Sequence, residues 1–162
     1  MAIKPGVYAA AMSIFNDDLS LDVNSTIKHF EKIIEEGLHG VVIFGSTGMA
    51  QLISSREKKE LISKLNNNKY KEKIIIGTGN NALLENIELI KHSLDNGIDK
   101  FLLGVPAYYK FGDDGAYSYF KTLIDKVPQI NIILYNFEKL FHYKFSVEIV
   151  QKLARDFPKQ IV

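Results

Sequence analysis

The sequence contains no cysteine and no tryptophan, and only four prolines in 162 residues. The absence of cysteine excludes disulfides, thiolate catalysis and cysteine-ligated zinc. It also fits a reducing compartment, and we expect a cytoplasmic protein. The net charge is only +1, which gives no electrostatic reason to expect binding to nucleic acid or to a membrane surface.

Long hydrophobic runs are missing too. No apolar run approaches the ~20 residues that a membrane-spanning helix needs. The polar run Asn16-Asp17-Asp18 ends the first apolar stretch too early for a signal peptide, so we expect none. The histidines show no ligand spacing, and we expect neither a metal site nor a cofactor. The remaining composition, 46% hydrophobic and 24% charged, is that of a globular domain.

Short apolar runs alternate along the chain with amphipathic segments of helical period. This pattern predicts strands at 6–13, 40–44, 73–77, 100–105 and 131–135, and helices at 19–37, 55–65, 83–96, 114–126 and 146–156. Residues 160–162 resemble the start of a sixth strand. Near-continuous apolar strands separated by amphipathic helices indicate a parallel sheet covered by helices. We therefore predict an α/β protein with one domain over residues 1–162.

Two folds fit this pattern, an open doubly wound sheet and part of a (β/α)8 barrel. The length favours the open sheet, because a barrel typically needs ~250 residues. The strand ends favour the barrel, since an open sheet concentrates its ligand at one switch point whereas here every strand end offers polar or small groups. The groups at the five ends are Ser13, Gly45-Ser46-Thr47-Gly48, Gly77-Thr78-Gly79, the segment 106–109, and Tyr135-Asn136.

The segment Gly45-Ser46-Thr47-Gly48 is the centre of the pattern. It follows a buried strand and would deliver hydroxyls and backbone N–H groups to a surface where small anions can bind. Gly45 and Gly48 are expected to allow positive φ and close approach of a ligand. An ordinary strand-to-helix turn, with Ser54 or Ser55 as the helix cap, would show the same pattern.

Two further signals have competing interpretations. The segment 77–82 matches the G-x-G-x-x-A dinucleotide pattern, but the acidic residue expected at the end of the next strand is missing, which argues against a nucleotide. Tyr135 closes an apolar strand, so its phenol is either a core group or an acid/base that exchanges protons with a substrate oxygen. Tyr108 and Tyr109 allow the same two interpretations.

These motifs together resemble the dihydrodipicolinate synthase / N-acetylneuraminate lyase family of class I aldolases, which are built on a (β/α)8 barrel. Gly45-Ser46-Thr47-Gly48 corresponds to the family's G-[TS]-T-G-E, the segment 106–110 to P-Y-Y-x-K, and Tyr135-Asn136-Phe137 to Y-N-x-P. Gly77-Thr78-Gly79 also matches, and the resemblance covers essentially all 162 residues.

The resemblance implies a pyruvate-dependent Schiff-base aldolase or lyase that acts on pyruvate or a related 2-keto acid and an aldehyde. Gly45, Ser46, Thr47 and Gly48 would bind the carboxylate of pyruvate, and Tyr135 would transfer protons beside the keto carbon. Thr47 would connect Tyr135 to Tyr108, which a neighbouring subunit supplies in many members. A homo-oligomer is therefore expected for the full-length form.

The chain also departs from the family pattern. Met49 replaces the motif's Glu, Glu138 replaces the Pro after Tyr-Asn-Phe, and Ala107 replaces the first Tyr of P-Y-Y. The bulky segment Phe141-His142-Tyr143 stands where a small Thr/Ser-Gly loop usually follows. Because this region would face the second substrate, the identity of the aldehyde is left open.

The largest departure concerns the nucleophile. The family's Schiff-base lysine lies on strand six, in a G-x-K-[DE] motif shortly after the position of Val162. No lysine of the chain matches it by position, so we expect a barrel truncated to about five βα units, inactive alone. The alternative is a non-catalytic module that binds carboxylates or takes part in assembly.

Overall fold

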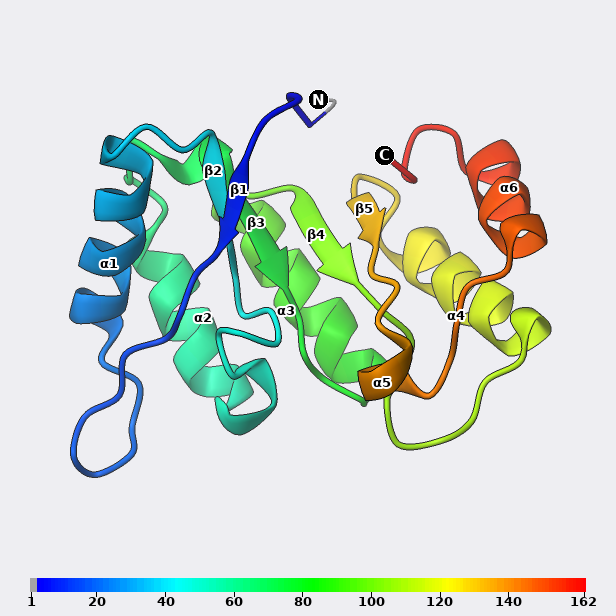
Figure 1. Ribbon diagram of the computed structural model, residues 1–162, viewed down its shortest axis with the longest axis horizontal. Helices are drawn as coiled ribbons and strands as arrows, with labels where there is room; N and C mark the ends of the chain where they lie inside the picture. Colours follow the sequence, from blue (N-terminus) through cyan, green and yellow to red (C-terminus); the bar gives the residue numbers. More distant parts are fainter. Residues whose placement is uncertain (1–2) are drawn as a thin grey trace.

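The computed structural model describes residues 3–162, which contain five strands that pair only in parallel (Figure 1). The strands are β1 (Tyr8–Ala10), β2 (Gly40–Ile43), β3 (Ile74–Gly77), β4 (Lys100–Leu103) and β5 (Asn131–Leu134). The helices are α1 (Val23–Glu35), α2 (Ser55–Lys64), α3 (Leu83–Asp95), α4 (Asp113–Lys126), α5 (Glu138–Phe141) and α6 (Val147–Asp156), with 3-10 turns η1 (Ala50–Leu52) and η2 (Lys71–Lys73). Among the described residues no helix is long and apolar enough to cross a membrane.

The strand order decides between the two predicted folds. The sheet runs β1-β2-β3-β4-β5 with no reversal. A doubly wound sheet needs a reversal, because its two halves are wound in opposite directions from a central switch point. Parallel crossovers are right-handed, so a sheet in chain order carries its helices on one face. The open doubly wound alternative is therefore wrong, and the sheet is consistent with a segment of a (β/α)8 barrel that is not closed.

The end of the described chain continues this order. Ile161 forms a parallel bridge with Ile132 of β5, and the Ile132 N–H donates to the Gln160 carbonyl at 2.6 Å. The Val162 N–H donates back to the Ile132 carbonyl at 3.0 Å. The predicted start of a sixth strand is thus confirmed, on the free side of β5.

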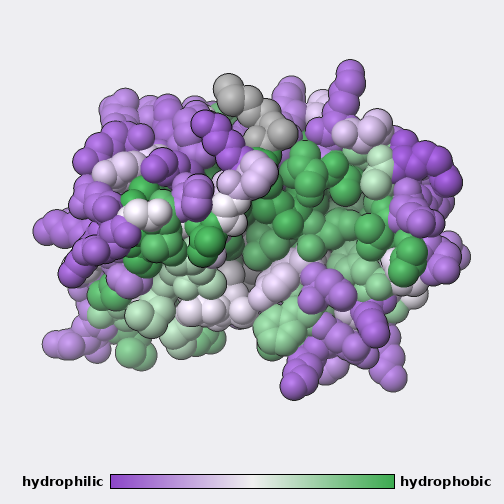
Figure 2. Space-filling view, turned by 45° about the horizontal axis from the view of Figure 1, so that its top comes forward, coloured by the Kyte–Doolittle hydropathy of each residue, from purple (hydrophilic) through white to green (hydrophobic). Residues whose placement is uncertain are grey.

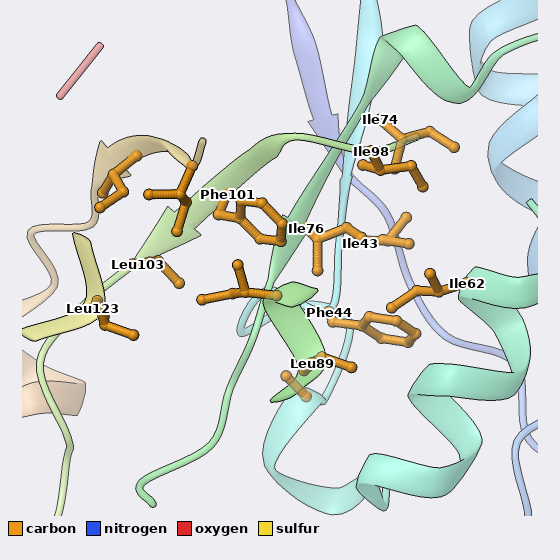
Figure 3. Packing of buried hydrophobic residues seen from close by; sticks show 14 of the residues in the cluster. Ile43, Phe44, Ile62, Ile74, Ile76, Leu89, Ile98, Phe101, Leu103 and Leu123 are labelled. Atoms are coloured by element: carbon orange, nitrogen blue, oxygen red, sulfur yellow. The ribbon is translucent and has the colours of Figure 1, made fainter. Parts of the chain in front are cut away.

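The main core lies between the sheet and its helices (Figure 3). One side of the strands supplies fully buried residues such as Ile43, Ile76 and Phe101, which face Ile62 of α2 and Leu89 of α3. Neighbouring helices contact one another in chain order. Packing on this side is what holds the strand ends in fixed positions.

The other side of the sheet is covered much less. Ala10 pairs beside Val42, and Leu102 pairs beside Ile133. These positions alternate with the core residues along each strand, so they point to the opposite face. Ala10 is exposed and the other three are only half-buried. The space-filling view shows hydrophobic residues gathered in a band between two hydrophilic flanks (Figure 2).

Local capping sets the helix starts. Ser54 caps α2 through a capping box with Glu57, which confirms one of the two predicted caps. Helix α1 begins at Val23 after the Asp22 cap, later than predicted from position 19. Leu19 has φ +68 and Leu21 pairs with Phe15 in an isolated bridge, so this segment forms a turn instead of a first helical turn.

Helix α5 was not predicted. It is a single turn that follows β5, and it ends at His142, which adopts the left-handed conformation with φ +50. Four residues give too little periodicity for a sequence signal. The turn nevertheless carries Leu140 and Phe141 to the ends of the strands, where both matter for the site described below.

We expect the chain to self-associate, because β1 is a sheet edge and the face opposite the helices is only partly covered. Sedimentation over a dilution series should show a mass that rises with concentration. Val7, 64% exposed beside β1, is a suitable place for a charge, and Val7→Lys should lower the apparent mass. Val147→Lys, at a comparably exposed position of α6, should not change it. A monomer at every concentration would contradict this expectation.

Candidate functional site at the strand ends

The carboxyl ends of β2, β3, β4 and β5 enclose a cavity of about 370 Å³. Its walls come from four loops: the segment after β2, Gly77–Asn81 after β3, Gly104–Ala107 after β4, and the segment from Tyr135 to α5. The volume lies within the range of small-molecule sites. Among the described residues that line it, none carries a charged side chain. Four of the five strand ends that the sequence singled out therefore converge on one cavity, and the end that carries Ser13 does not line it.

The loop after β2 takes its shape from unexpected residues. Phe44 and Met49 have positive φ values of 56° and 55°, whereas neither Gly45 nor Gly48 does. The prediction that these glycines supply positive φ is wrong. A bulky residue such as Phe44 in this region is strained, and such strain persists only where the surroundings enforce it.

The glycines act through close packing. A Cβ on Gly48 would lie 3.0 Å from the Ala11 carbonyl oxygen, and a Cβ on Gly77 would lie 2.3 Å from the Phe44 carbonyl oxygen. A side chain at either position would push the loop away from its neighbours. The Gly48 carbonyl also accepts a hydrogen bond from the Ser13 hydroxyl at 2.7 Å. The ends of β1, β2 and β3 are thereby tied together.

Ser46 and Tyr135 meet at this rim, although 89 residues separate them in the sequence. Their hydroxyl oxygens lie 2.9 Å apart in a hydrogen bond. The Tyr135 N–H donates to the Leu103 carbonyl at 2.8 Å, which continues the β4–β5 pairing and fixes the position of the tyrosine. Both residues line the cavity. A phenol and an aliphatic hydroxyl in contact can bind a carboxylate or carbonyl oxygen and relay a proton.

The other predicted site residues take different places. Gly45 lines the cavity with Ser46, while Thr47 and Gly48 lie in the same turn but are not among its lining residues. Thr47 is exposed. Tyr108 is 79% exposed, and its ring packs edge-on against Tyr109 at 5.0 Å between centroids. In this chain the hydroxyl that reaches Tyr135 is that of Ser46, and a connection through Thr47 to Tyr108 stays a prediction.

Lys58 is a functional candidate that sequence reasoning missed. It is fully buried in α2, and its ammonium donates to the Thr78 carbonyl at 2.7 Å and to Asn80 Oδ1 at 2.9 Å. Burial lowers the pKa of Lys58 to about 8, and the charge of Glu85 opposes that shift. Thr78 and Asn80 both line the cavity, so Lys58 braces one of its walls from behind. The sequence did not indicate this burial, because Lys58 stands in a run of four charged residues, Glu57-Lys58-Lys59-Glu60.

No cluster of metal ligands accompanies these residues. Within residues 3–162 there is no group of three or more His, Asp or Glu side chains that could hold a metal ion. The polar side chains that line the cavity are the hydroxyls of Ser46, Thr78 and Tyr135 and the amides of Gln51, Asn80 and Asn81.

A sequence model of the dihydrodipicolinate synthetase family matches residues 4–162. The chain belongs to this family. The match confirms the resemblance inferred from the motifs at the strand ends.

Particular members of the dihydrodipicolinate synthetase family show how far the similarity extends. A 4-hydroxy-tetrahydrodipicolinate synthase from Thermosipho africanus is 33% identical over 152 residues, which are 93% of this chain and 51% of that protein. The crystal structure of dihydrodipicolinate synthase from Agrobacterium tumefaciens superposes with a TM-score of 0.91 at 26% identity, over 98% of this chain and 56% of that one. The dihydrodipicolinate synthase of Acinetobacter baumannii, solved with pyruvate, gives a TM-score of 0.82 at 33% identity, over 92% and 51%. The chain spans about half the length of the curated relatives it matches.

The depressed pKa of Lys58 predicts a pH-dependent stability. Between about pH 8 and pH 10 the folded chain has lost the Lys58 proton that the unfolded chain still binds, so the free energy of unfolding rises with pH in this window. Lowering the pKa of Lys58 from 10.5 to about 8 corresponds to a change on the order of 3 kcal/mol in the free energy of unfolding. Lys58→Met should remove the rise in urea unfolding followed by circular dichroism.

The matched control is Lys91→Met, which removes an exposed lysine of α3 and should keep the wild-type pH dependence. Burial raises the pKa of Tyr119 and of Tyr143, which lowers stability above pH 10, so the comparison is confined to lower pH. If the free energy of unfolding had the same pH dependence in the wild type and in Lys58→Met, folding would not lower the pKa of Lys58.

Proposed function

We propose that this chain forms the 2-keto-acid-binding part of a pyruvate-dependent class I (Schiff-base) aldolase or lyase. The observation that carries the proposal is the contact of the Ser46 and Tyr135 hydroxyls at 2.9 Å, at the mouth of a cavity formed by four strand ends. The relative from Acinetobacter baumannii, whose structure contains pyruvate, supports the choice of ligand.

The turn after β2 is suited to bind a carboxylate. Its internal backbone bonds use the N–H groups of Met49 and Ala50, which donate to the carbonyls of Ser46 and Gly45. We assign the N–H groups and hydroxyls of Ser46 and Thr47 to the carboxylate of the keto acid. Hydrogen bonds from N–H and O–H groups to an anion are stronger than those to neutral acceptors.

Tyr135 is assigned the proton transfers. An imine-forming reaction moves protons when the keto oxygen leaves as water and when the enamine forms or is consumed. A carboxylate held at Ser46 would place the adjacent keto carbon within reach of the Tyr135 phenol, because the two hydroxyls already touch. Ser46 would then both bind the substrate and orient the phenol.

Thr47 and Tyr108 are assigned to a relay that a second subunit completes. Both are exposed in the single chain, and Tyr108 stands with Tyr109 on the rim of the β4 loop. Exposed adjacent tyrosines are typical of contact surfaces. Because a second subunit completes this relay, the proposal also states that the whole protein forms a homo-oligomer.

Pyruvate should bind to the chain and depend on both hydroxyls. Ser46→Ala and Tyr135→Phe should each weaken binding, by about tenfold or more for a hydrogen bond to a charged ligand. Saturation-transfer NMR of pyruvate would measure the affinities. Ser118→Ala and Tyr109→Phe, which remove the same groups outside the cavity, should leave them unchanged. Equal affinity for all four variants would refute the proposed site.

Pyruvate should bind without forming an imine. Lys100 lies at the opposite end of β4 and pairs with Asp99 and Glu72, and Lys58 is closed off from the cavity by the groups it binds. Borohydride reduction in the presence of pyruvate, followed by mass spectrometry, should therefore show no stoichiometric adduct. A specific adduct on one lysine would overturn the assignment of the nucleophile to a residue outside this chain.

A further inference from the structure

The residues that line the cavity differ in chemistry. Ser46 and Tyr135 provide hydroxyls, and we call this part the hydroxyl end. Leu102 and Val105 of the β4 region and Leu140 and Phe141 of α5 provide apolar side chains, and we call this part the apolar end. The two parts adjoin, because the Phe141 ring packs against the ring of Tyr135. With a keto acid at the hydroxyl end, the apolar side chains are left to contact the second substrate.

Phe141 defines the apolar end. Its ring lies edge-on to the ring of Tyr135, with 5.4 Å between centroids and planes at 75°. The ring fills the space above Gly104, where a Cβ would come within 2.6 Å of it. The absence of a side chain at Gly104 is therefore what allows an aromatic wall directly beside the proposed proton-transfer group.

Two side-chain oxygens of the cavity lining already accept hydrogen bonds, whereas Asn80 Nδ2 is buried without a partner. Asn81 Oδ1 accepts a hydrogen bond from the Ala107 N–H at 2.7 Å, and Asn80 Oδ1 accepts one from Lys58. A sugar-like aldehyde that entered the apolar end would bury hydroxyl groups against carbon, which is unfavourable. A carboxylate or phosphate on the aldehyde would find no cation among the described lining residues.

We infer that the second substrate is an uncharged aldehyde with an apolar body, such as an aromatic ring, which binds against Phe141 and Leu140. This inference rests on the proposed function, because it takes the hydroxyl end as the keto-acid site. It narrows the substrate class to aldehydes that lack sugar hydroxyls and anionic groups.

Saturation-transfer NMR with three probe aldehydes tests the inference on the chain itself. Benzaldehyde should bind at least about tenfold more tightly than glyceraldehyde or succinic semialdehyde, a ratio in the range of apolar-pocket discrimination. Phe141→Ser should reduce benzaldehyde affinity about tenfold, and Phe141→Leu should retain most of it. Leu84→Ser, at an exposed position of α3 outside the cavity, should have no effect. Leu140→Ser provides a second test if Phe141→Ser does not fold.

The possible outcomes separate this inference from the proposed function. Equal affinities for the three aldehydes would overturn the inference even if pyruvate binds as proposed. So would a benzaldehyde affinity that neither Phe141→Ser nor Leu140→Ser changes. Failure of pyruvate to bind overturns the proposed function instead. Tight benzaldehyde binding that both Phe141→Ser and Leu140→Ser weaken supports the apolar end as the aldehyde site.

Discussion

Parallel pairing of five strands in chain order is the constraint on which the rest of the structure depends. It places every strand's carboxyl end on one rim, so loops far apart in sequence become neighbours there. Ser46 and Tyr135 meet for this reason and not because of any local signal. The same order puts the helices on one face, where they bury the hydrophobic core and leave the other face partly open.

The sequence allowed much of this to be predicted, because hydrophobic period and turn residues are local properties. All five strands and the five longer helices lie at the predicted places, and Gly37 ends α1 with the positive φ expected of a helix stop. The family followed from motifs at the strand ends. The family match over residues 4–162 and a relative at 33% identity agree with that inference.

What could not be predicted depends on tertiary contacts. Phe44 and Met49 adopt positive φ because neighbouring strand ends hold the turn, while the glycines beside them serve close packing. The burial of Lys58 depends on the packing of α2 against the loop after β3, so the sequence alone cannot distinguish it from a surface lysine. Helix α5 is too short to show a period, yet it brings Phe141 to Tyr135. Each of these features shapes the cavity, where the sequence alone was least informative.

The central claim is that the Ser46 and Tyr135 hydroxyls act as one unit on a keto acid, and a double-mutant cycle on pyruvate affinity tests it most directly. Ser46→Ala, Tyr135→Phe and the double variant would be compared with the wild type by NMR titration. The account predicts a coupling energy of about 1 kcal/mol or more, because each hydroxyl orients the other. If the losses of binding free energy in the two single variants sum to the loss in the double variant within about 0.4 kcal/mol, the two groups act independently and the account is contradicted.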